Sequence, residues 1–158
     1  MQILKLIGGM LLLAACFGVS HYFSVIEKKR MERVRDLIHL IRYIKDKVDC
    51  YSMPIDKIFD ACGGDILLKL GIEEKVRDLS ELFGKLENTC DSKSEKILYE
   101  LAGNFGKGYR EHQMRLCDIA VSALERHLGV LESTYPMRKK RLSTLCFSIG
   151  GMLLIALL

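Results

Sequence analysis

A glycine-rich segment in the second half of the chain has the residue types of a phosphate-binding loop. Residues 103–108 are Gly-Asn-Phe-Gly-Lys-Gly. A P-loop needs four residues between its two glycines and a Ser or Thr directly after the lysine. Here two residues separate Gly103 from Gly106, Gly108 follows Lys107, and no strand pattern precedes the segment. We therefore predict a tight turn between two helices, with Gly106 and Gly108 as its structural residues.

Histidine and cysteine are the other residue types that could carry chemistry. The 4 His residues are isolated along the chain, and none of the 6 Cys residues forms a C-x-x-C pair. Metal sites typically need closely spaced ligands, and a catalytic site needs a nucleophile beside a base. We predict no catalytic, cofactor-binding or metal site, and a protein that is not an enzyme. The cysteines are expected to be small buried side chains kept reduced in the cytosol.

Both ends of the chain are apolar. Residues 6–26 and residues 142–158 contain no Asp, Glu, Lys or Arg. At about 1.5 Å per residue, a helix of about 20 residues crosses a hydrocarbon core of about 30 Å, and about 17 residues is the lower limit. The pattern predicts an N-terminal transmembrane helix within residues 1–26 and a C-terminal transmembrane helix over residues 142–158.

Basic residues follow the first apolar segment and precede the second. Positive charge is retained on the cytoplasmic side of a membrane. We therefore predict that residues 27–141 form a cytoplasmic domain, and that the basic residues at its two junctions can contact anionic lipid. These junction residues are Lys28, Lys29, Arg30, Arg138, Lys139, Lys140 and Arg141.

Small residues lie inside both apolar ends. Ala14 and Gly18 are four positions apart, and Gly150 and Gly151 are adjacent. Small residues let membrane helices approach one another closely. Gly and Ala are also common in membrane helices generally, so the sequence leaves open whether these four residues form packing contacts.

The first apolar segment also allows a different interpretation. A Leu-Ala-Ala-Cys sequence ending at Cys16 resembles the processing site of an exported lipoprotein, which would be lipidated at that cysteine. The apolar region of a signal peptide is about 7–15 residues long and is followed by polar sequence. Here the apolar run continues to residue 26 and basic residues follow. We keep the lipoprotein as an alternative to the membrane helix.

The middle of the chain repeats apolar residues at steps of three and four, which is typical of amphipathic helices. No Pro or Gly separates the first stripe from the apolar segment, so one helix is expected over residues 6–48. Ser52 and Pro54 mark the start of the next helix, and Ser92 with Glu95 forms a capping box. Pro136 should bend or break the last helix. The first stripe is Val34, Leu37, Ile38, Ile41, Ile44 and Val48.

These patterns predict an all-α fold. No segment alternates as a strand would, so we expect a bundle of about five or six helices between the two transmembrane helices. The formal net charge of +4 is distributed over a middle region in which acids alternate with bases. Nucleic-acid binding, which needs a basic face, is therefore not expected.

The order of several segments resembles the stage III sporulation protein AB family of endospore-forming bacteria. The opening residues 5–9, the Met-Pro-Ile step at 53–55, and the turn at Phe105 and Gly106 followed by Gln113 are similar to that family. The resemblance continues through the basic segment and the Gly-Gly-Met-Leu-Leu-Ile ending at residues 150–155, so it covers nearly the whole chain.

The resemblance implies a membrane component of the complex that joins mother cell and forespore during sporulation. The family is similar to the type II secretion F domain, a non-enzymatic platform in the membrane. We expect a stage III sporulation protein AA-like cytoplasmic ATPase and other membrane proteins of the complex as partners. The expected location is the mother-cell side, in the outer forespore membrane. A ligand-sensing membrane bundle is the alternative of a different class.

Overall fold

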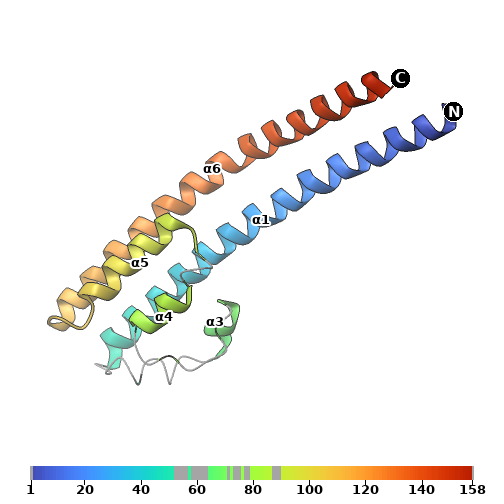
Figure 1. Ribbon diagram of the computed structural model, residues 1–158. Coiled ribbons are helices and arrows are strands. Elements are labelled where there is room, and N and C mark those ends of the chain that lie inside the picture. The colour runs from blue at the N-terminus through green and yellow to red at the C-terminus, as the bar shows by residue number, and fades with distance from the viewer. Residues whose placement is uncertain are drawn as a thin grey trace. The chain divides into compact units, whose positions relative to one another are not determined.

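The computed structural model describes residues 2–51, 57, 64–70, 72, 76, 79–86 and 90–157. Within the helices, the side chains of residues 2–7, 9–13, 50–51, 64–66, 153–154 and 156–157 lie outside this description. The residues described form five helices and no strand, so the predicted all-α class is confirmed (Figure 1). The helices are α1 (Gln2–Tyr51), α3 (Gly64–Lys69), α4 (Leu79–Leu86), α5 (Ser92–Asn104) and α6 (Arg110–Leu157).

The two longest helices are α1, with 50 residues, and α6, with 48 residues. Helix α1 passes without interruption from the apolar segment into the amphipathic segment, as predicted. A bend or a break was predicted at Pro136; helix α6 continues through this residue, so the break is wrong. Pro136 and Glu132 are both exposed. The carbonyl that loses its hydrogen bond one turn before the proline can therefore be hydrated, which makes the proline tolerable inside the helix.

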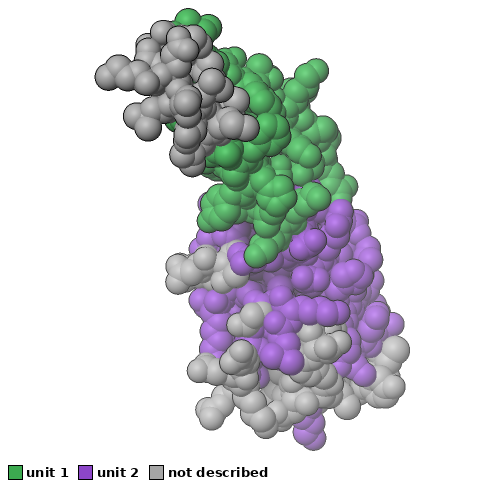
Figure 2. All heavy atoms as spheres, turned by 90° about the vertical axis from the view of Figure 1, so that its right-hand side faces the viewer, with its two compact units in different colours: residues 1–29, 131–158 green, residues 30–130 purple. Residues whose placement is uncertain are grey.

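The chain divides into two compact units, which Figure 2 shows in different colours. Unit 1 consists of Met1–Lys29 and Leu131–Leu158, and unit 2 consists of Arg30–Val130. Helices α1 and α6 each contribute residues to both units.

Unit 1 is a pair of antiparallel helical segments from α1 and α6, with both chain ends at the same end of the pair (Figure 1). The rings of Phe17 and Phe147 meet edge to face, with centroids 5.2 Å apart. Nη1 of Arg138 lies 3.3 Å from Oε1 of Glu27. These contacts are separated by ten residues on α1 and nine on α6, so the antiparallel register is regular over this length.

The predicted transmembrane helices are not shown by this structure. Among the residues described, no helix has a stretch both long enough and apolar enough to cross a bilayer. The predicted spans include side chains outside that part of the chain, at 6–7, 9–13, 153–154 and 156–158. The two membrane helices therefore remain a prediction.

Unit 2 is held together by a core of aliphatic side chains. All six residues of the first predicted stripe on α1 are buried, from Val34 to Val48. Leu82 of α4, Leu98 of α5 and Leu124 of α6 are buried with them. Burying a side chain of this size contributes about 1.5–3 kcal/mol. The predicted amphipathic patterns are thus confirmed on the helices that carry them.

Ion pairs join α1 and α6 along the surface of unit 2. Nζ of Lys45 lies 2.6 Å from Oδ1 of Asp118. Further pairs form between Arg42 and Glu125 and between Asp49 and Arg110. Exposed pairs of this kind contribute only about 0–1 kcal/mol each. They fix the antiparallel register of the two helices within unit 2, and the aliphatic core supplies most of the stability.

Candidate functional site

The best-defined polar cluster in unit 2 is centred on Asp91, the residue directly before α5. Asp91 has the extended backbone of a helix N-cap, with φ −79° and ψ 149°. The sequence prediction placed the cap one residue later, at Ser92, which is instead the first residue of the helix. The Asp91 carboxylate makes no hydrogen bond to a backbone N–H of α5. It is therefore available to side chains from other elements.

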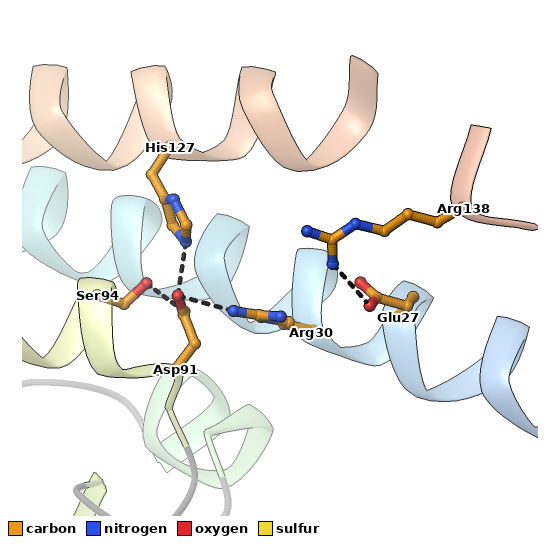
Figure 3. A network of polar contacts seen from close by, with 6 residues as sticks. All are labelled: Glu27, Arg30, Asp91, Ser94, His127 and Arg138. Atoms are coloured by element: carbon orange, nitrogen blue, oxygen red, sulfur yellow. Dashed lines mark hydrogen bonds and ion pairs between the residues drawn. The ribbon is translucent and has the colours of Figure 1, made fainter. Parts of the chain in front are cut away.

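Three side chains converge on this carboxylate (Figure 3). Ser94 Oγ donates a hydrogen bond of 2.6 Å to Asp91 Oδ1. His127 Nε2 lies 2.6 Å from Asp91 Oδ2, and Arg30 Nη2 lies 3.1 Å from the same oxygen. Because Arg30 belongs to α1, Ser94 to α5 and His127 to α6, the cluster connects three helices within unit 2.

The cluster is largely removed from water. The side chains of Asp91 and His127 are 8% and 6% exposed, and that of Arg30 is 37% exposed. Burial alone would raise the pKa of Asp91, but the hydrogen bonds from Ser94 and Arg30 and the neighbouring His127 outweigh it and lower that pKa. The carboxylate is therefore ionised at neutral pH and accepts charge-assisted hydrogen bonds.

The geometry favours a structural role over acid–base catalysis. Ser94 donates to the carboxylate rather than to His127, so the cluster lacks the Ser–His pair of a nucleophilic triad, and the lowered pKa of Asp91 makes its carboxylate a weak base. Nε of Arg30 and Nδ1 of His127 are buried and have no hydrogen-bond partner among the residues described. Arg30, Asp91 and Ser94 also line a cavity of about 10 Å³. A cavity of that size holds about one water molecule.

Sequence reasoning treated His127 as an isolated residue and missed this cluster. His127 lies three residues after Leu124 and four before Leu131, both of which are buried. It therefore occupies the apolar face of α6, where a polar side chain needs a partner. That position was a usable indication of a buried polar contact. Its partner, 36 residues away, could not be named from local sequence.

The predicted turn between α5 and α6 is confirmed. Gly106 has φ 82°, the left-handed conformation that glycine adopts most easily. Gln113 Nε2 donates a hydrogen bond of 3.1 Å to the carbonyl of Gly108. A Cβ atom at Gly108 would lie 2.9 Å from the ring of His112. Pro54, the other predicted turn residue, lies outside the residues described.

The predicted junction residues occupy different environments. Lys28, Lys29, Lys139, Lys140 and Arg141 are exposed in unit 1. Arg138 is also in unit 1 and pairs with Glu27, as Figure 3 shows. Arg30 belongs to unit 2 and bonds to Asp91.

The four small residues of the apolar ends differ in their exposure, and their packing against other membrane helices stays a prediction. Ala14 and Gly18 are exposed, and a Cβ atom added at Gly18 or Gly151 would meet no atom within 4 Å. Gly150 is buried. The intact chain therefore does not use Gly18 or Gly151 for close approach of its own helices.

The cysteines that the structure describes have no metal-binding arrangement around them. In that part of the chain, no group of three or more His, Cys, Asp or Glu side chains could hold a metal ion. Burial raises the pKa of both Cys90 and Cys117 to about 11. The thiolate, which is the reactive form, is therefore scarce at both positions at neutral pH.

The observations define an all-α protein in which a helical unit with an aliphatic core is joined to a pair of antiparallel helical segments. The chain belongs to the stage III sporulation protein AB family, whose model matches residues 5–158. This confirms the resemblance inferred from sequence. No curated protein and no solved structure matches the chain.

Proposed function

We propose that the protein is a non-enzymatic membrane platform of the sporulation complex that joins mother cell and forespore. Unit 1 inserts into the membrane, and unit 2 docks a cytoplasmic secretion ATPase and conveys its position or motion to the membrane partners through helix packing. The family assignment supports the sporulation role. The platform and the ATPase are what the resemblance to secretion platforms implies.

The observation that carries the membrane part is the apolar surface of unit 1. Soluble proteins rarely expose large contiguous apolar patches. Large hydrophobic side chains of both helical segments are exposed here, among them Phe17 and Tyr22 on α1 and Ile149 and Met152 on α6. Ile155, near the C-terminal end of α6, is 76% exposed. A hydrocarbon environment would remove the cost of exposing these side chains to water.

The distribution of charge supports the same placement. The exposed cations of unit 1 lie on the parts of α1 and α6 nearest to unit 2 in sequence. Cations in such positions favour the cytoplasmic side and the anionic surface of the membrane. This orientation places unit 2 in the compartment where an ATPase can reach it.

The cluster around Asp91 supports a mechanical role for unit 2. It joins α1, α5 and α6 through one buried carboxylate. Both α1 and α6 extend into unit 1. A partner that displaces α5 therefore acts on the two helices that continue toward the proposed membrane segments.

Topology is the first test, and the structure guides the choice of probe. Cys90 is half-buried and its raised pKa makes it a slow target for a maleimide. Lys107 is exposed in the α5–α6 turn, so Lys107→Cys in an otherwise cysteine-free chain is the better probe. We expect an impermeant maleimide to label it only after cell lysis. Labelling in intact cells would contradict the proposal and favour the lipoprotein alternative.

The ATPase partnership needs a separate test. We expect tagged full-length protein to co-purify with the AA-like ATPase when both are co-expressed, and a tagged unrelated membrane protein to fail. The purified protein alone should not hydrolyse ATP. Hydrolysis by a preparation free of the ATPase would contradict the platform role, and failure of co-purification would remove the partnership.

A further inference from the structure

A groove of about 340 Å³ lies between the two helical segments of unit 1. Its lining changes in character along the helices. Phe23, Leu142 and Leu145 line the part of the groove nearer to the two chain ends. Glu27 of α1 and Arg138 of α6 line the part further from the chain ends. Because the segments are antiparallel, the groove has an apolar part followed by a charged part.

The charged part of the groove has cations that no carboxylate neutralises. Arg138 is paired with Glu27, the one acidic residue in the lining. Lys139 and Arg141 also line the groove, are exposed, and have no ion-pair partner among the residues described. Two positive charges are therefore available to an anion, although Glu27 limits how close the anion can come on the α1 side.

We propose that this groove binds an anionic phospholipid. The phosphate group lies beside Lys139 and Arg141, and the part of an acyl chain next to the headgroup lies along Phe23, Leu142 and Leu145. The graded polarity distinguishes this occupant from inorganic phosphate, which would leave the apolar part empty. The net positive lining distinguishes it from a zwitterionic lipid, whose own cation would meet Lys139 and Arg141. The site rests on the membrane placement proposed above and adds a specific ligand class to it.

Binding is tested on the purified full-length protein in a neutral detergent, titrated with fluorescent phosphatidylglycerol and, in parallel, phosphatidylcholine. We expect phosphatidylglycerol to bind more tightly. The double variant Lys139→Gln/Arg141→Gln should weaken it about 25-fold, from roughly fivefold for each cation near a lipid surface. The matched control Lys28→Gln/Lys29→Gln removes the same charge from exposed residues outside the groove lining. It should change affinity less than about twofold.

Circular dichroism checks that each variant keeps its helix content. Unchanged affinity in the Lys139/Arg141 variant would overturn the site.

Other outcomes also overturn the proposal. Equal weakening in the Lys28/Lys29 control would mean diffuse attraction to any anionic surface. Equal affinity for phosphatidylcholine would mean a purely apolar site, and displacement of the lipid by millimolar inorganic phosphate would mean an anion site. The assay contains only this chain and lipid, so its failure is separate from failure of the topology or ATPase tests.

Discussion

At the scale of single residues, Asp91 has two roles that usually belong to different side chains. Its backbone forms the N-cap of α5, and its carboxylate binds side chains of α1 and α6 as well as Ser94. Burying a carboxylate is unfavourable unless it is paired and hydrogen-bonded. Ser94, His127 and Arg30 provide these contacts to Asp91.

Replacing Asp91 with Asn should destabilise unit 2. The change keeps the size of the side chain but removes the charge that Arg30 and His127 face, and hydrogen bonds to charged groups contribute about 1.5–3 kcal/mol. We expect the free energy of unfolding to fall by about 2–3 kcal/mol, measured by urea titration of helical circular dichroism. Glu125→Gln removes an exposed ion pair instead and should cost less than about 1 kcal/mol. Equal losses of unfolding free energy would mean that the buried cluster contributes no more to stability than an exposed ion pair.

The lowered pKa of Asp91 predicts how this contribution depends on pH. In the unfolded chain, Asp91 takes up a proton near its ordinary pKa of 3.8, whereas in the folded protein its carboxylate remains ionised to a lower pH. The stabilisation is therefore complete above the unfolded pKa and is lost as pH falls through the folded pKa. We expect the difference in free energy of unfolding between the native protein and Asp91→Asn to have the same value at about pH 5 and slightly above it. This difference should shrink below about pH 4. A difference that grew below pH 4 would contradict this assignment.

At the scale of secondary-structure elements, α6 combines a buried stripe with an exposed face. Leu124 is fully buried, whereas Ile119 on the same helix is 58% exposed. Leu124→Ala should cost about 2–5 kcal/mol through lost burial and a residual cavity. Ile119→Ala should change the free energy of unfolding by less than about 0.5 kcal/mol. Urea titration of both variants measures the two losses of unfolding free energy, and losses of similar size would mean that the buried stripe is misassigned.

The α5–α6 turn and the middle of α6 contain glycines with opposite expected responses to alanine. Gly106→Ala places a side chain at a positive φ and should destabilise by about 1–2 kcal/mol. Gly129 lies inside α6, where an added Cβ would meet no atom within 4 Å. Gly129→Ala should therefore stabilise by up to about 1 kcal/mol. The midpoint temperature of thermal unfolding should fall for Gly106→Ala and rise for Gly129→Ala. A shift of the same sign in both variants would refute the turn geometry.

At the scale of the whole molecule, the sequence was most informative where structure depends on local periodicity. The continuous α1, the buried stripe from Val34 to Val48 and the turn at Gly106 follow from apolar spacing and glycine chemistry. The contact of Asp91 with Arg30 and His127 depends on tertiary packing, and no local pattern pairs residues so far apart. Pro136 shows the converse, because a strong local preference against helix is overridden within a long helix.

The proposed membrane insertion of unit 1 makes a prediction about its exposed apolar face. Ile149 and Met152 are 58% and 76% exposed on α6. An aspartate at the centre of a membrane helix costs about 2.5–3.5 kcal/mol. Because α1 would still anchor the protein, the double variant Ile149→Asp/Met152→Asp is combined with Phe17→Asp/Val19→Asp on the exposed face of α1. The combined variant should shift the protein from the carbonate-washed membrane pellet to the soluble fraction. Leu68→Asp makes the same kind of change at an exposed position of unit 2 and should leave the protein in the pellet. If the combined variant stayed in the pellet as well, these faces of α1 and α6 would not contact lipid, and the apolar surface of unit 1 would have to be covered by another protein.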